Sequence, residues 1–97
     1  MEDILKNIKA LADENRLKII KLLLYNNLCV GALAKKLQIS ESAVSQQLKI
    51  LREADLVMGE KKGYFVHYKV KNEKLQNLGR YIIELSDEKC DENGCCQ

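Results

Sequence analysis

The spacing of apolar residues changes twice along this chain, and each change indicates a change of secondary structure. Up to about Ala54 the apolar positions recur every three to four residues, as in amphipathic helices. Between Val57 and Val70 apolar and polar residues alternate, as in strands, and Lys62-Gly63 supplies the glycine of a tight hairpin turn. After Asn72 the helical spacing returns. The pattern predicts a mainly α fold of about five helices, with a small β-hairpin before the last one.

Capping residues predict where the helices before the hairpin begin. Asp13 precedes the second apolar helix, and its carboxylate can accept a hydrogen bond from a backbone amide of the first turn. A brief third helix is expected over residues 30–37, followed by a short turn at residues 38–40. Ser40 then caps a fourth helix that runs to about Ala54. A helix, a short turn and a second helix are therefore predicted at the centre of the chain.

The fourth predicted helix has two chemically different faces. Apolar side chains occupy one stripe at helical spacing and are expected to enter the core: Val44, Leu48 and Leu51. Polar side chains occupy the opposite stripe at the same spacing: Ser42, Ser45, Gln46 and Lys49. A polar stripe of this kind is either an ordinary solvated face or a binding surface, and the neighbouring elements decide between the two.

Helix, turn, helix and then a basic hairpin is the order of a winged helix-turn-helix, whose second helix enters the major groove of DNA. Serine and glutamine side chains can bond to base edges, and lysine and arginine neutralise phosphates. Lys35 and Lys36 would flank the same groove. We therefore predict a DNA-binding surface in residues 40–52 and in the hairpin. The residues expected to read bases are Ser42, Ser45, Gln46 and Gln47, and the capping Ser40 belongs to the same DNA-binding surface. The expected phosphate contacts are Lys49, Arg52, Lys61, Lys62 and a backbone donor of Tyr64.

Charge is distributed unevenly along the 97 residues. The formal net charge is +2, yet residues 84–97 contain five acidic side chains against Lys89 alone. The preceding residues therefore carry the positive excess expected of a DNA-binding domain. No proline, Gly/Ser-rich linker or internal repeat divides the chain before this tail. We predict one DNA-binding and dimerisation domain at residues 1–88 and a cysteine-containing tail at residues 89–97.

The four cysteines are interpreted from the expected compartment. No segment reaches the apolar length that spans a bilayer, and the N-terminus lacks a signal-peptide pattern. A cytoplasmic protein without a membrane partner is expected, in which cysteines are thiols, metal ligands or redox switches rather than a disulfide framework. An enzyme is not expected, because neither a Cys-x-x-Cys motif nor an activating base accompanies the thiols.

Three segments resemble a known family. Residues 10–17 (ALADENRL), 40–49 (SESAVSQQLK) and 51–57 (LREADLV) resemble the opening segment, the recognition helix and the exit into the wing of the ArsR/SmtB family of metal-responsive repressors. The resemblance implies a symmetric dimer that occupies a palindromic operator until an inducer arrives. It also implies pairing through the first and last helices, which carry more apolar residues than one thin domain covers easily.

Sulfur dominates the candidate ligands for an inducer. Cys90, Cys95 and Cys96 place three thiols within seven residues, a set that suits trivalent arsenic or antimony. Cadmium, lead or zinc can use the same three thiols with Cys29 as a fourth ligand. The similarity to arsenic-responsive members of the family, some of which also place thiols near the C-terminus, favours arsenite or antimonite.

Other interpretations of the thiols remain open. Residues 28–33 (LCVGAL) resemble the family's metal box with Gly31 in place of its second cysteine, so Cys29 is either an accessory ligand or a small buried apolar residue. The tail thiols can instead respond to oxidants or persulfides, although the acidic neighbours Asp91 and Glu92 disfavour thiolate formation. His67 is expected to be an exposed strand residue and not a ligand.

Overall fold

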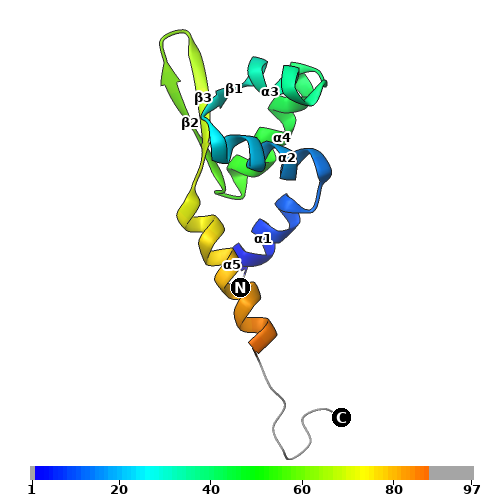
Figure 1. The fold of residues 1–97 in the computed structure, drawn as a ribbon, viewed down its shortest axis with the longest axis vertical. Coiled ribbons are helices and arrows are strands. Elements are labelled where there is room, and N and C mark those ends of the chain that lie inside the picture. Colours follow the sequence, from blue (N-terminus) through cyan, green and yellow to red (C-terminus); the bar gives the residue numbers. More distant parts are fainter. Residues whose placement is uncertain (1, 88–97) are drawn as a thin grey trace, which may run out of the picture.

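The fold was obtained as a computed structural model that describes residues 2–87 (Figure 1). The predicted tail at residues 89–97, with Cys90, Cys95 and Cys96, lies outside the described residues. The elements, in chain order, are α1 (Glu2–Leu11), α2 (Glu14–Tyr25), β1 (Leu28–Cys29), α3 (Val30–Leu37), α4 (Glu41–Glu53), β2 (Val57–Lys62), β3 (Phe65–Val70) and α5 (Asn72–Asp87). The predicted helices and hairpin are confirmed, and the short strand β1 is an addition.

Side-chain caps set the start of the two central long helices, as their sequences predict. The Asp13 carboxylate accepts a hydrogen bond from the backbone amide of Arg16 at 3.1 Å, at the start of α2. The Ser40 hydroxyl accepts one from the backbone amide of Ala43 at 3.0 Å, at the start of α4. Each cap satisfies an amide that has no partner within its own helix. The boundaries of α2 and α4 are therefore encoded locally.

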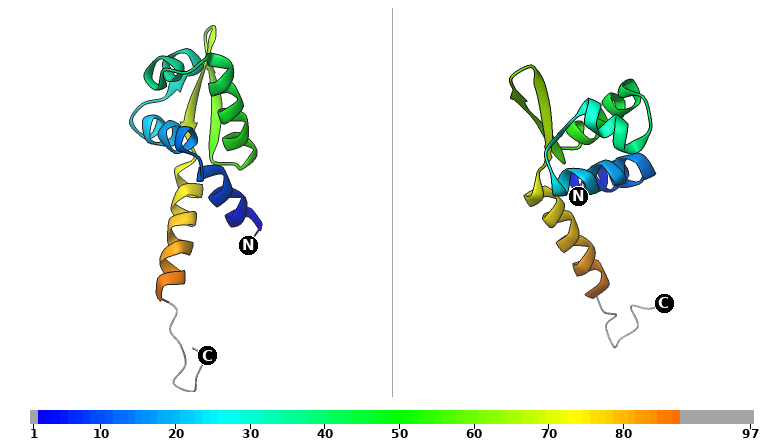
Figure 2. Two further views of the ribbon diagram at one scale, coloured as in Figure 1. Left: turned by 90° about the vertical axis from the view of Figure 1, so that its right-hand side faces the viewer. Right: turned by 45° about the horizontal axis from the view of Figure 1, so that its top comes forward.

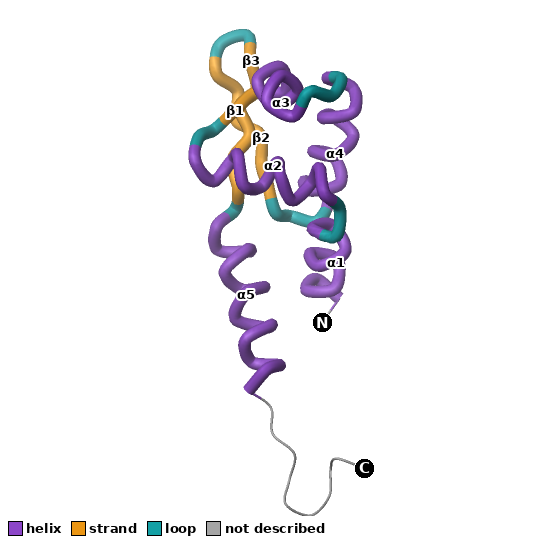
Figure 3. Tube along the Cα trace, turned by 45° about the vertical axis from the view of Figure 1, so that its right-hand side comes forward, coloured by secondary structure: helices purple, strands orange, loops and turns teal. Residues whose placement is uncertain are grey.

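The core lies where one face of α4 meets α2, α3 and the base of the hairpin. Val44, Leu48 and Leu51 are at most 1% exposed, which confirms the predicted apolar stripe of α4. They belong to a cluster that includes Ile19 of α2 and Leu33 of α3. Figure 3 shows α4 packed behind α2 and α3, with the hairpin projecting beside them. Burial of this stripe holds α4 against the domain and directs its other face outward.

The sheet is antiparallel, with strand order β1-β3-β2. Residues 57–70, named here the wing, form β2, β3 and the turn between them, in which Gly63 has a left-handed φ of +62°. Gly59 lies opposite Tyr68, and a Cβ at Gly59 would lie only 2.8 Å from Cγ1 of Val66. The glycine therefore allows close contact across the strands.

The tip of the wing is exposed on both faces, and one expectation for the wing is corrected. Phe65 and Val66 are both exposed, because the tip projects beyond the core and only the base, at Val57 and Val70, is buried. His67 is half-buried rather than exposed, since β1 pairs with β3 at this position and covers that edge. Strand β1 has only two residues, too few to show an alternating pattern, so the sequence alone did not predict that it covers this edge of β3.

Helix α5 extends away from the body of the domain, at the opposite end from the wing tip (Figures 1 and 2). It contacts α1, and Leu78 is buried. One helical turn and two turns further along, Ile82 and Leu85 are 50% and 49% exposed, and Leu5 of α1 is 48% exposed. The described chain thus leaves apolar surface uncovered on its first and last helices.

Asp55 joins the end of α4 to the start of α5 and gives a prediction for acid stability. The backbone of Asp55 adopts a left-handed φ of +63°. Its carboxylate accepts hydrogen bonds from Lys71 and, at 3.3 Å, from Lys74. The hydrogen bonds from Lys71 and then Lys74 lower the pKa of Asp55 below its ordinary value of 3.8. The stabilisation is therefore complete above that value and is lost as the pH falls through the lowered pKa. Thermal unfolding at several pH values between about 3 and 7 should show Asp55→Asn less stable than wild type at neutral pH, with the difference shrinking in acid.

The matched control for this prediction is Glu14→Gln. Glu14 pairs with Lys18 across one turn of α2 at 3.4 Å, and both side chains are largely exposed. Exposed pairs of this kind contribute little to stability, so the control should unfold almost as wild type does at every pH. A difference between Asp55→Asn and wild type that persists unchanged in acid would contradict the assignment.

Candidate nucleic-acid interface

The α3-turn-α4 unit is held rigidly by its own short connection. Gln38 ends α3 with a left-handed φ of +58°, and the backbone amide of Ile39 donates to the carbonyl of Ala34 at 3.2 Å. Ser40 then caps α4 directly. Because the buried stripes of both helices enter one core, their relative orientation is fixed by packing as well as by the turn. The unit has the form that presents a second helix to a groove.

The predicted polar stripe of α4 is exposed. Within residues 2–87 the side chains of Ser45, Gln46 and Lys49 make no hydrogen bond or ion pair, so their donors and acceptors are available to a partner. Ser42 is also exposed and lies 3.3 Å, hydroxyl to hydroxyl, from the capping Ser40. Arg52 is exposed near the end of the helix. The stripe therefore combines free hydrogen-bonding groups with two cationic side chains.

Gln47 differs from the other predicted base-reading residues. Its side chain is half-buried, and its Oε1 accepts a hydrogen bond from Nη1 of Arg16 at 2.8 Å. Adjacent residues on a helix point about 100° apart, so Gln46 faces outward while Gln47 turns toward α2. Sequence reasoning did not single out Arg16, because the contact joins residues 31 positions apart and leaves no local pattern.

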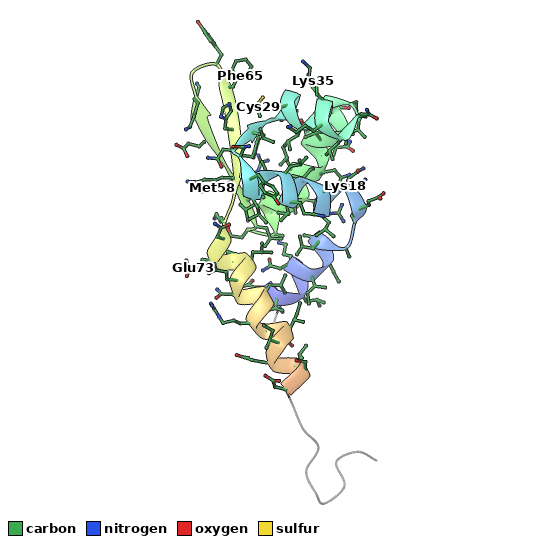
Figure 4. All side chains as sticks on the ribbon, viewed as in Figure 1. Lys18, Cys29, Lys35, Met58, Phe65 and Glu73 are labelled. Atoms are coloured by element: carbon green, nitrogen blue, oxygen red, sulfur yellow. The ribbon has the colours of Figure 1, made fainter. Side chains whose placement is uncertain are left out.

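The wing contributes basic groups at the end of the molecule that also carries α3 (Figures 1 and 2). Lys61 and Lys62 are exposed at the outer end of β2, and Tyr64 is fully exposed in the turn. In Figure 4 Lys35 points outward from α3. The predicted phosphate-contacting residues thus lie on α4 and on the wing, and α4 is joined directly to the wing through residues 54–56.

Cys29 lies between the first turn of α3 and the middle of strand β3 of the wing. Its backbone caps α3 without a side-chain hydrogen bond, and its thiol is free and half-buried (Figure 4). The strand register places Cys29 opposite His67 and His67 opposite Glu60, so the three residues form a row across the sheet. Among residues 2–87, however, no three histidine, cysteine or acidic side chains are grouped closely enough to hold a metal ion. Cys29 therefore supplies one soft donor but not a complete site.

None of the helices within residues 2–87 combines the length and the apolar character that a bilayer span needs.

Comparison with known proteins identifies the same architecture. Residues 13–58, from the cap of α2 to the start of the wing, match the model of the family "Bacterial regulatory protein, arsR family". The chain is 41% identical over 75 residues to the transcriptional repressor SmtB homolog of Synechocystis, covering 77% of this chain and 57% of that protein's length. It is 34% identical over 98 residues to the arsenical resistance operon repressor of Bacillus subtilis, covering 94% and 88% of the two chains.

Solved structures agree with these sequence relatives. An ArsR-like transcriptional regulator from Rhodococcus superposes with a TM-score of 0.80 at 25% identity, covering 88% of this chain and 80% of that one. A homodimeric winged helix-turn-helix DNA-binding domain from Mycobacterium bovis superposes with a TM-score of 0.74 at 26% identity, covering 90% and 81%. These superpositions confirm the predicted fold class, and the relatives are all named as transcriptional regulators or DNA-binding domains rather than as enzymes.

Proposed function

Because this chain belongs to the arsR family of bacterial regulatory proteins, we propose that it is a repressor that binds a palindromic operator as a homodimer and leaves it when a thiophilic ion binds. The observation that carries the DNA-binding part is the exposed polar stripe of α4, on which Ser45, Gln46 and Lys49 make no hydrogen bond or ion pair within residues 2–87. The core holds this helix from behind, and the basic wing continues its surface. Preorganised donors and acceptors on a rigid helix are what direct readout of base edges requires.

The roles of individual residues in this proposal follow from their placement. Ser42, Ser45 and Gln46 face outward and read base edges, and the capped N-terminus at Ser40 lies close to a phosphate. Lys49, Arg52, Lys61 and Lys62 neutralise phosphates, with a backbone donor of Tyr64 at the wing tip. Gln47 is considered separately below, because its amide already has a partner.

Gln46 and Lys62 should fail in different ways when each is replaced by alanine. Gln46→Ala is expected to cost about 1–3 kcal/mol at the base pair it reads and to relax the preference at that position. Lys62→Ala should weaken binding to all sequences alike and reduce the slope of log affinity against log salt by about one. Fluorescence anisotropy on an operator and its single-base-pair variants, over a range of salt concentrations, measures both quantities.

Arg80→Ala is the charge-matched control for Lys62→Ala. Arg80 is exposed on α5, at the opposite end of the molecule from the wing tip. Its removal should leave the salt slope unchanged. Equal salt slopes for wild type, Lys62→Ala and Arg80→Ala would contradict the phosphate role of the wing. An unaltered base preference in Gln46→Ala would contradict the reading role of α4.

The homodimer rests on the uncovered apolar surface of the first and last helices. Leu5, Ile8, Ile82 and Leu85 are each more than a third exposed in the single chain. Association of α1 and α5 with those of a second copy would bury them, as expected for an isologous interface. The Mycobacterium bovis relative is a homodimer, which supports the same assembly here.

The proposed inducer is trivalent arsenic or antimony, bound by the tail thiols Cys90, Cys95 and Cys96. Three thiolates match the trigonal sulfur coordination of these elements, and a close relative is an arsenical resistance operon repressor. Cys29 is an accessory donor at most in this arrangement, and it becomes a fourth ligand if the ion is cadmium, lead or zinc. Binding releases DNA if the ion-bound dimer fits the operator less well than the free dimer does.

A titration of the operator complex tests the inducer assignment. Arsenite or antimonite should release the reduced wild-type protein, whereas a variant with serine at positions 90, 95 and 96 should stay bound. Cys29→Ser is the matched control and should respond as wild type does. Release by cadmium, lead or zinc that requires Cys29 would replace arsenic with the four-thiol alternative, and release by oxidant or persulfide alone would make the protein a redox-responsive repressor. If none of these agents weakens binding, the sensor proposal is wrong.

A further inference from the structure

Arg16 joins three helices through one side chain. It lies in the first turn of α2, where its backbone amide donates to the capping Asp13. Its Nε donates to the backbone carbonyl of Ala10 in α1 at 2.6 Å, and its Nη1 donates to Oε1 of Gln47 in α4 at 2.8 Å. Both hydrogen bonds are part-buried and span segments that the sequence separates.

The chemistry of this contact requires arginine. The Ala10 carbonyl belongs to the last turn of α1, where the helix dipole is negative and a cation is favoured. The planar guanidinium has donors at fixed directions, so it can serve the Ala10 carbonyl and the Gln47 amide at the same time. A lysine ammonium is a single point of charge on a flexible stem and cannot bridge both acceptors with the same geometry.

A second contact, made by Asn7, connects α1 to the C-terminal end of α4. Asn7 is the one buried polar residue within residues 2–87. With its amide nitrogen turned toward the carbonyls, Asn7 donates to the carbonyl of Ala54 at 2.6 Å and to that of Asp3 at 3.3 Å. Helix α1 is therefore held at the middle of α4 through Arg16 and Gln47, and at its C-terminus through Asn7. Two separate hydrogen-bonded contacts fix the orientation of α1 relative to α4, whereas a single contact would let the two helices rotate about it.

We infer that Arg16 is a positioning residue that sets the orientation of α4 relative to α1. The hydrogen-bonded link from Ala10 through Arg16 to Gln47 is named here the lock, and we infer that Gln47 belongs to it instead of reading a base. The inference rests on the proposed function, in which α1 helps to form the dimer and α4 reads DNA. The spacing of two half-sites on DNA demands a defined angle between the two copies of α4. Through the lock, the geometry of the dimer helix is passed to the reading helix, and operator affinity depends on a residue that touches no DNA.

The test compares Arg16→Met, Gln47→Met and the double variant. Methionine keeps an unbranched, flexible stem at each position but removes the donors of Arg16 and the acceptor of Gln47. Each protein is titrated with a duplex of about 30 base pairs, selected by the wild type from a random pool, and with a scrambled duplex of the same composition. We expect each single variant to lose about tenfold in the ratio of operator to scrambled affinity, and the double variant to lose no more than either single variant.

Two further variants separate a positioning role from other roles. Gln46→Met is the matched control on the same helix, and its loss should add to that of Arg16→Met because the two side chains share no contact. Gln47→Glu keeps an acceptor oxygen for the guanidinium and should retain the wild-type affinity ratio, since the scrambled duplex records the general cost of the added charge. Unfolding curves establish that each variant is folded at the titration temperature.

The outcomes decide between the proposals. Additive losses in Arg16→Met and Gln47→Met would overturn the lock, as would a change of base preference at one position in Gln47→Met alone. Reduced stability with an unchanged affinity ratio would make Arg16 an ordinary structural residue and would also overturn it. If the wild type selects no duplex from the pool, the proposed function itself is wrong, which is a different result from a wild type that binds and variants that do not couple.

Discussion

Replacing Leu48 with alanine is expected to lower the free energy of unfolding by about 3 kcal/mol and to abolish operator binding at growth temperature. Leu48 is 1% exposed at the centre of the buried stripe of α4, within the cluster that joins α4 to α2, α3 and the wing. Its truncation removes buried apolar atoms and leaves a cavity that the surrounding helices can only partly close. Since a domain of this size has a stability of about 5–15 kcal/mol, this loss is a large share of the total.

Urea denaturation followed by circular dichroism measures this effect, with Ile50→Ala as the control. Ile50 is on the same helix but is 39% exposed, so its truncation should cost less than about 1 kcal/mol. Helix propensity cannot explain a difference of this size, because alanine is favoured over leucine and isoleucine in a helix by less than about 1 kcal/mol. Equal losses in the two variants would show that α4 is not held by its buried stripe, against the packing described above.

Replacing Ile82 with glutamate is expected to separate the dimer and to reduce operator affinity by more than about 100-fold. Ile82 is half exposed on α5, one turn beyond the buried Leu78, on the surface proposed to meet the second copy. A carboxylate in an apolar interface would have to be buried without a partner, which costs several kcal/mol. Loss of the dimer then removes the advantage of engaging both half-sites together, so the effect on DNA binding exceeds that of any single contact.

Sedimentation equilibrium gives the oligomeric state, and anisotropy with the selected duplex gives the affinity. Gln76→Glu is the matched control, because it adds the same carboxylate to an exposed position of α5 on a different face. It should remain dimeric and bind as wild type does, apart from a small general effect of charge. A dimer that survives in Ile82→Glu would place the interface elsewhere on the surface.

The fold could be predicted where its causes are local. The caps at Asp13 and Ser40 and the buried stripe of α4 depend on residues within one or two turns of each other, so their spacing carries the information. The turn of the wing is local in the same sense, because Gly63 supplies the left-handed backbone that a tight hairpin needs. The structure confirms these predictions without a change of element type.

The sequence could not predict what depends on distant partners. Strand β1 has only two residues and exists because it pairs with β3, so no alternating pattern in the sequence predicts it. The half-burial of His67 follows from that pairing, and the exposure of both faces of the wing tip follows from its distance from the core. These features arise from contacts between segments that are far apart in the chain.

The polar stripe of α4 shows where the two kinds of information meet. Its helical spacing, with a cap before it and a basic hairpin after it, was sufficient by itself to predict a DNA-reading surface, because amphipathic order is written in neighbouring residues. Gln46 and Gln47 have the same chemistry at adjacent positions, and their helical spacing does not show which of the two amides has a partner in the folded domain. Only the tertiary structure separates them, because it brings Arg16 from α2 to the amide of Gln47 and leaves that of Gln46 unpaired among the described residues.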